Sequence, residues 1–97
     1  PAAGQVLVSR RFTSPDHCFV VVAVSSQAAL ETFLQLMATD GVTVKAQLPI
    51  PVSGGLYVTP RLGPITVDKN EMLRVINRNA LPAQAGEEVQ ASLFIEP

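Results

Sequence analysis

The chain has 97 residues, of which 47% are apolar and 15% are charged, and its formal net charge is −1 at pH 7. This length corresponds to a single domain with a hydrophobic core of its own. The near-neutral charge and the lack of a basic run argue against binding to nucleic acid or to an anionic membrane surface. No apolar stretch reaches the roughly eighteen residues that a membrane-spanning helix needs.

The N-terminal third predicts two strands joined by a turn. The first strand covers residues 5–12 and carries Arg10 and Arg11 near its end, and Thr13 to Asp16 form the turn. Residues 18–24 are almost all apolar and β-branched, which is typical of a strand buried on both faces. We expect Cys18 to be a small buried apolar residue, because a lone cysteine cannot form an internal disulfide.

Residues 27–39 have two interpretations. Apolar residues recur there at the spacing of an amphipathic helix, namely Leu30, Phe33, Leu34 and Met37. A helix at 27–39 would make the chain a small α/β domain, a class that includes cytoplasmic regulatory and ligand-binding modules. Read as a strand, the segment has apolar residues on both of its faces.

The rest of the chain predicts short strands separated by turns. The stretch 48–55 contains two Pro and two Gly, so we expect a loop or an excursion at a sheet edge. Residues 88–96 show the cleanest alternation of apolar and polar residues. Further strands are predicted at 42–46, 56–59, 65–67 and 72–77. Six or seven short strands in this rhythm are typical of an all-β sandwich or barrel.

Catalytic and metal-binding motifs are absent from the sequence, so we expect no enzyme, no catalytic residue, no metal and no cofactor. The candidate site residues are Arg10 and Arg11. Successive residues on a strand point to opposite faces, so one of the two should point toward the core or a cleft. An inward Arg is costly unless it meets an anion, and a carboxylate suits its guanidinium best. The alternative is that both side chains extend into solvent at the strand end.

The C-terminal half resembles a known family. It contains Val58-Thr59-Pro60, a polar turn at Asp68 to Glu71, and the run Met72-Leu73-Arg74-Val75, followed by Leu81-Pro82, Glu87-Glu88 and a final Ile95-Glu96-Pro97. This order is similar to the "V-[ST]-P-P", polar turn, "LR[VI]" pattern of periplasmic pilus-assembly (PapD-like) chaperones. The acidic ending resembles the archaic, spore-coat-type branch. Arg61 departs from the pattern, standing where the family usually has a second Pro.

The resemblance implies a specific fold. Residues 1–97 would be one immunoglobulin-like β-sandwich, the N-terminal domain of a two-domain protein, with 27–39 as a strand. Family members continue with a seventh strand, which we do not expect within residues 1–97. The expected fold is therefore an incomplete sandwich that lacks its last strand and is open to pairing with another chain.

The resemblance also implies a function. The chain would be a periplasmic chaperone module that binds a pilus subunit by donor-strand complementation, a form of β-augmentation. Arg10, and more weakly Arg11, would bind the C-terminal carboxylate of the subunit. The expected partners are the pilus subunit and an outer-membrane usher, and the open edge allows a strand-swapped homo-oligomer. The alternative from the same evidence is a pilus subunit or another strand-binding adhesive sandwich.

Overall fold

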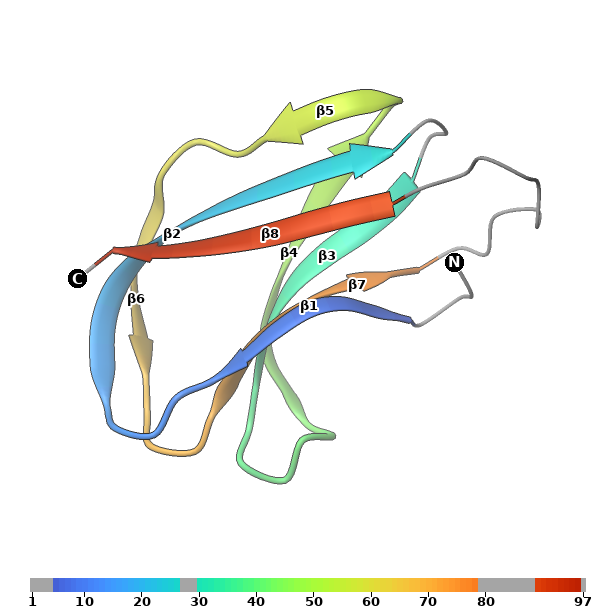
Figure 1. Ribbon diagram of the computed structural model, residues 1–97. Coiled ribbons are helices and arrows are strands. Elements are labelled where there is room, and N and C mark those ends of the chain that lie inside the picture. The colour runs from blue at the N-terminus through green and yellow to red at the C-terminus, as the bar shows by residue number, and fades with distance from the viewer. Residues whose placement is uncertain (1–4, 27–29, 79–88, 97) are drawn as a thin grey trace.

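The computed structural model describes residues 5–26, 30–78 and 89–96, which form eight strands in two antiparallel sheets (Figure 1). In chain order the strands are β1 (Val6–Arg11), β2 (Asp16–Ser26), β3 (Leu30–Met37), β4 (Val44–Val52), β5 (Gly55–Val58), β6 (Leu62–Val67), β7 (Met72–Asn77) and β8 (Val89–Glu96). The predicted all-β sandwich is confirmed.

The strand β2 is the centre of one sheet, which we call sheet B. Its residues 19–26 pair with β8, while its residues 16–20 pair with β6 and 23–26 pair with β5. Because β8 occupies one side of β2 over most of its length, β5 and β6 must lie end to end along the other side. The Val-rich run therefore has hydrogen-bonded neighbours on both of its edges.

Thr59 bridges the break between β5 and β6. The Val22 N–H donates to Thr59 Oγ1 at 2.9 Å, and the Thr59 N–H donates to the Val22 carbonyl at 2.9 Å. The next residue, Pro60, has no N–H to donate. Gly63 then adopts a φ of +122°, and a Cβ at this position would lie 3.0 Å from the Cys18 carbonyl oxygen. Only glycine fits this approach to β2 without strain.

The second sheet, sheet A, has the strand order β1-β7-β3-β4. Its third strand corrects the helix alternative for 27–39, because 30–37 form β3 and residues 27–29 lie outside the described ranges. In β3 the apolar residues serve both faces: Leu34 lies opposite the core residue Val75, and Phe33 lies opposite Ile76. Pairing with β7 and β4 therefore outweighs the local helical spacing.

The stretch 48–55 also differs in part from the expectation. Residues 48–52 continue β4 as an edge strand that includes Pro49 and Pro51. A proline is tolerated there because an edge strand needs backbone bonds on one side only. The two prolines also remove N–H groups that another chain would need in order to pair with this part of the edge.

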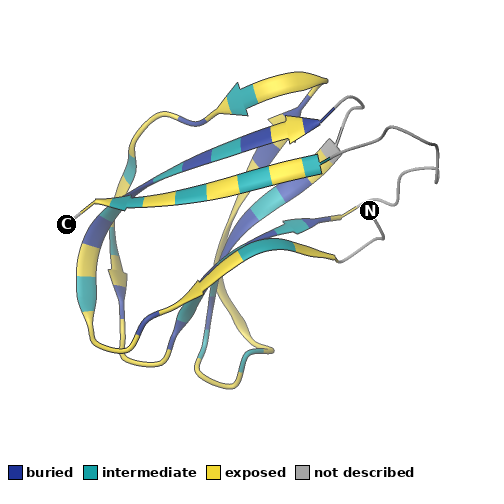
Figure 2. Cartoon of the chain, in the orientation of Figure 1, coloured by how far each residue is buried: buried dark blue, intermediate teal, exposed yellow. Residues whose placement is uncertain are grey.

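The core lies between the sheets, and buried side chains alternate with less buried ones along β2 and β7 (Figure 2). On β2, Cys18, Val20, Val22 and Val24 are all 0% exposed, which confirms the buried Cys18. The prediction that this strand is buried on both faces is wrong, because Phe19, Val21 and Ala23 on the outer face are only half-buried. The described residues place no layer over that face.

The strands β7 and β8 follow their predicted patterns. On β7, Leu73 and Val75 are buried in the core and Arg74 lies on the outer face. On β8 the apolar residues of one face pack against the core, namely Val89, Ala91, Leu93 and Ile95. The eight described strands give four strands to each sheet. The immunoglobulin-like topology and the missing last strand stay predictions.

Leu73→Ala tests the core. Leu73 is 1% exposed, so we expect its truncation to lower the free energy of unfolding by about 2–5 kcal/mol, because it removes apolar contacts and leaves a cavity. The control is Val42→Ala at a site that is 79% exposed, which should change that free energy by less than about 0.5 kcal/mol. Urea denaturation measures both variants, and equal losses would contradict the assigned core.

Candidate partner-binding site

Arg10 lies on the inner face of sheet A, at its β1 margin. It is opposite Leu73, and cross-strand neighbours share a face. Its side chain is exposed, and its guanidinium carbon lies 5.7 Å from the centre of the Phe12 ring. No carboxylate in the described ranges forms an ion pair with Arg10. Arg10 is therefore a cationic group with an aromatic ring beside it, at the open side of the sandwich between β1 and β8. We call this open side the Arg10 mouth.

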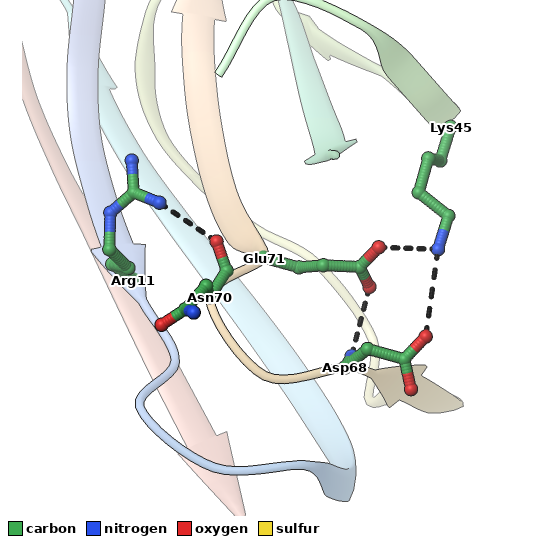
Figure 3. Close-up of polar contacts among 5 residues, drawn as sticks. All are labelled: Arg11, Lys45, Asp68, Asn70 and Glu71. Carbon is green, nitrogen blue, oxygen red and sulfur yellow. Dashed lines mark hydrogen bonds and ion pairs between the residues drawn. The ribbon is translucent and has the colours of Figure 1, made fainter. Parts of the chain in front are cut away.

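Arg11 lies on the opposite face of β1 and is already engaged. Its Nη1 donates to the Asn70 carbonyl at 2.8 Å (Figure 3). Asn70 has a φ of +68°, in the turn that leads into β7. The Asn70 N–H in turn donates to the Phe12 carbonyl at 2.7 Å. Arg11 thus stabilises the turn at Asn70. The two arginine side chains lie on opposite faces of β1 and do not form one site.

An ion-pair cluster lies beside the Asn70 turn that Arg11 contacts. Lys45 Nζ lies 2.5 Å from Glu71 Oε2 and 3.9 Å from Asp68 Oδ2 (Figure 3). The Asp68 N–H also donates to Glu71 Oε1 at 2.9 Å. The Glu71 side chain is 6% exposed, although the sequence suggested only a polar turn. Because Lys45 and Glu71 lie 26 positions apart, no local pattern indicated their contact.

The cluster shifts the pKa values of its members. The hydrogen bond from Lys45 holds the pKa of Glu71 below its ordinary value, and the bond from the Asp68 N–H adds to the lowering. The same contact with Glu71 raises the pKa of Lys45. Both residues are therefore charged at neutral pH, and the cluster ties β4 to the turn before β7.

The sandwich has two open sides. On one, β1 of sheet A passes beside β8 of sheet B (Figure 1). The core-facing residues of β8 that line this side are only half-buried. On the other, a cleft of about 260 Å³ lies between β4 and β6, and its apolar lining includes Leu36, Leu48 and Ile65. Apolar surface is therefore accessible at both sides, and Arg10 belongs to the first.

A larger hollow lies on the outer face of sheet A. It has a volume of about 410 Å³, and its lining includes Phe33, Pro49, Pro51 and Arg78. The Arg78 guanidinium carbon is 5.7 Å from the centre of the Phe33 ring and its Nε is 3.9 Å from Glu31. Sequence reasoning missed this hollow, because it forms only where β3 and β4 pair.

The described residues show no arrangement for nucleophilic chemistry at Cys18. Burial is the main cause that raises the pKa of the thiol, the charge of Asp16 adds to it, and that of Arg10 acts in the opposite direction. His17 Nδ1 lies 3.0 Å from Thr66 Oγ1, on the other face of β2. Within the described ranges no group of three or more His, Cys, Asp or Glu is placed to hold a metal ion.

Comparisons with models of known families, with curated proteins and with solved structures found no match to this chain. The described ranges also contain no helix with the length and apolarity that a membrane crossing requires. The chaperone resemblance and the roles of Arg10 and Arg11 therefore stay predictions. The geometry distinguishes between the two residues, because within the described ranges Arg11 has a backbone acceptor and Arg10 has none.

Glu71→Gln tests the ion-pair cluster. The folded pKa of Glu71 lies below its unfolded value, so the pair stabilises fully above the ordinary glutamate pKa and its contribution is lost as the pH falls through the folded value. We expect the variant to be less stable than the parent at pH 7 and to lose less stability on acidification. Thermal unfolding midpoints from neutral to acid pH measure this.

Asp40→Asn provides a comparison at another turn. N–H groups of Thr43 and Val42 lower the pKa of Asp40 from 3.8 to about 2, so its contribution is lost between those two values. The stability of the Asp40→Asn variant should therefore change with pH differently from that of the parent only between about pH 2 and pH 3.8. A Glu71→Gln curve that runs parallel to the parent curve at every pH would contradict the assigned role of Glu71.

Proposed function

We propose that this chain is a noncatalytic module that binds an extended segment of another polypeptide as an added strand beside β1, with Arg10 gripping the C-terminal carboxylate of that segment. The observation that carries the proposal is the position of Arg10. It is exposed at the end of an open sheet edge and has no carboxylate partner in the described chain.

The free edge of β1 has backbone groups available for pairing. The Phe12 N–H donates to the Glu71 carbonyl at 2.8 Å, so residue 12 faces β7. Backbone groups alternate along an antiparallel pair, so Ser9 and Arg11 direct theirs away from β7. A segment whose carboxylate reaches Arg10 and whose body extends back toward Val6 must run parallel to β1. Its direction is therefore set by the position of Arg10.

The space beside β1 suits alternating apolar side chains. Leu7 and Val8 on β1 are half-buried, and so are the core-facing residues of β8. Alternate side chains of an added strand would point into this mouth and cover the apolar surface, while the others would remain in solvent. The segment would thus gain backbone hydrogen bonds, apolar burial and one charge-assisted contact.

The other edge of sheet A suits this role less well. Pro49 and Pro51 remove donors from β4, and Lys45 lies on the same strand. The far edge of sheet B is divided between β5 and β6, with Thr59 and Pro60 at the break. Along β1, by contrast, no proline interrupts the pairing.

The partner we propose is a pilus subunit, bound in the periplasm before its assembly with the help of an outer-membrane usher. The support is the similarity of residues 56–97 to pilus chaperones and the exposed position of Arg10, the residue that the similarity implies as the carboxylate anchor. A second candidate, a pilus subunit or other adhesive sandwich that accepts a strand, is favoured by the apolar cleft between β4 and β6. That candidate does not need Arg10.

Binding of a labelled peptide tests the proposal. The peptide alternates Val and Thr, has one residue for each of the 6 in β1, and is made as the free acid and as the C-terminal amide. We expect the free acid to bind about tenfold more tightly, because a charge-assisted hydrogen bond to Arg10 contributes roughly 1.5 kcal/mol. Fluorescence anisotropy measures both dissociation constants.

Arg10→Ala and Arg11→Ala form a matched pair of variants. Arg10→Ala should remove the preference for the free acid, whereas Arg11→Ala should keep it, because the Arg11 guanidinium donates to the Asn70 carbonyl instead. Equal affinities of acid and amide for the parent would contradict the anchor. If those equal affinities were also lowered by Leu48→Lys in the β4–β6 cleft, the strand-accepting alternative would be supported.

A further inference from the structure

The outer face of sheet B is an apolar surface that the described chain does not cover. Leu56 is 69% exposed, Phe94 is 55% exposed and Val58 is 53% exposed. Val58 is opposite Ala23 and Phe94 is opposite Val21, two half-buried outer residues of β2, while Leu56 is opposite the exposed Ser25. The apolar surface therefore runs from β5 across Ala23 and Val21 to Phe94. The other outer residues of β8 are polar, namely Gln90, Ser92 and Glu96.

The outer face of sheet A shows the contrast. Arg74 Nε donates to Gln35 Oε1 at 2.8 Å, and Gln35 Nε2 donates to Gln47 Oε1 at 2.7 Å. This polar row crosses β7, β3 and β4 and covers the middle of that sheet. On sheet B, by contrast, the outer residues in the middle of β2 are apolar and remain in contact with solvent, namely Phe19, Val21 and Ala23.

The charges on this face do not oppose a second copy. Arg61 lies 3.1 Å from Glu96, and its guanidinium carbon is 3.9 Å from the centre of the Phe19 ring. The two opposite charges compensate each other at the margin of the surface. The chain as a whole has a net charge of only −1, so repulsion between copies is small.

We propose that a second copy of this chain packs on the outer face of sheet B, giving a two-fold symmetric dimer. Two twisted sheets can pack face to face in an aligned arrangement, and a two-fold axis brings the same residues of both copies together. The occupant is therefore another sheet B, with Phe94, Val58 and Leu56 of each copy at the interface. The Arg10 site lies elsewhere and takes no part.

The size of the surface predicts a weak dimer. The 11 residues of β2 span about 36 Å at the usual rise of a strand, and three strands are about 14 Å wide. Each copy would then bury about 500 Å², which gives about 1,000 Å² in total and lies at the lower limit for a specific interface. We expect a dimer that dissociates on dilution.

Sedimentation velocity from low micromolar to millimolar concentration tests the inference. The parent should change reversibly from monomer to dimer as concentration rises. Phe94→Ser and Val58→Ser, on opposite margins of the surface, should each raise the dissociation constant about tenfold, because buried apolar anchors dominate small interfaces. Val42→Ser removes an equally apolar exposed residue from a turn far from this surface and should leave the constant unchanged.

Each remaining outcome would overturn the inference. A monomer at every concentration would exclude the second copy as occupant. If Phe94→Ser and Val58→Ser leave the dimer intact, its interface is not the outer face of sheet B. The same conclusion follows if Arg10→Ala dissociates the dimer. A dimer that persists on dilution and exchanges subunits only slowly would be a strand-swapped species. Thermal unfolding of each variant confirms that it remains folded.

Discussion

Among the described strands, only β2 pairs with three others, and the arrangement of both sheets follows from this. Its core-facing residues are completely excluded from water, so the second sheet must cover them. Its outer residues Phe19, Val21 and Ala23 are also apolar but have no cover in the described chain. The strand thus supplies the driving force for folding on one face and leaves apolar surface exposed on the other.

The edges of the two sheets differ in how readily they could pair with another strand. Prolines in β4 and the break between β5 and β6 make those edges poor templates for another strand. The mouth between β1 and β8 has no such interruption, and it is the side where a cationic residue stands without a carboxylate partner in the described ranges. Edge protection and charge therefore both favour the same side of the sandwich for the strand binding that we propose.

Much of the fold was predictable because strands leave a short-range signature. The alternation in 72–77 and 88–96 placed the inward side chains of β7 and β8 correctly, and the apolar run at 18–24 identified β2. The segment 27–39 was ambiguous, because its apolar residues satisfy a helical spacing and also serve both faces of a strand. Only the pairing of β3 with β7 and β4 resolves that ambiguity, and this pairing is not local.

The site could be predicted only in part. Alternation indicated that Arg10 and Arg11 would face opposite ways, and the structure places them so. Alternation could not indicate that Arg11 donates a hydrogen bond to the Asn70 carbonyl, because these two residues lie 59 positions apart. The buried Glu71 and the cleft between β4 and β6 likewise arise from segments that meet only in the fold.

The exposed apolar surface and the Arg10 mouth lie on different parts of the molecule, so self-association and partner binding need not compete. A dimer through sheet B would leave β1 of each copy at a margin of sheet A. Such an assembly would present two strand-binding edges, and a partner with two segments would gain from their proximity.

Amide hydrogen exchange, followed by NMR with and without a bound peptide that ends in a free carboxylate, distinguishes strand addition beside β1 from pairing at β4. The amides of Ser9 and Arg11 point away from β7, so binding beside β1 should slow their exchange strongly while leaving β4 unchanged. Protection that appears along residues 44–48 instead, or on neither edge, would contradict strand addition at the Arg10 mouth.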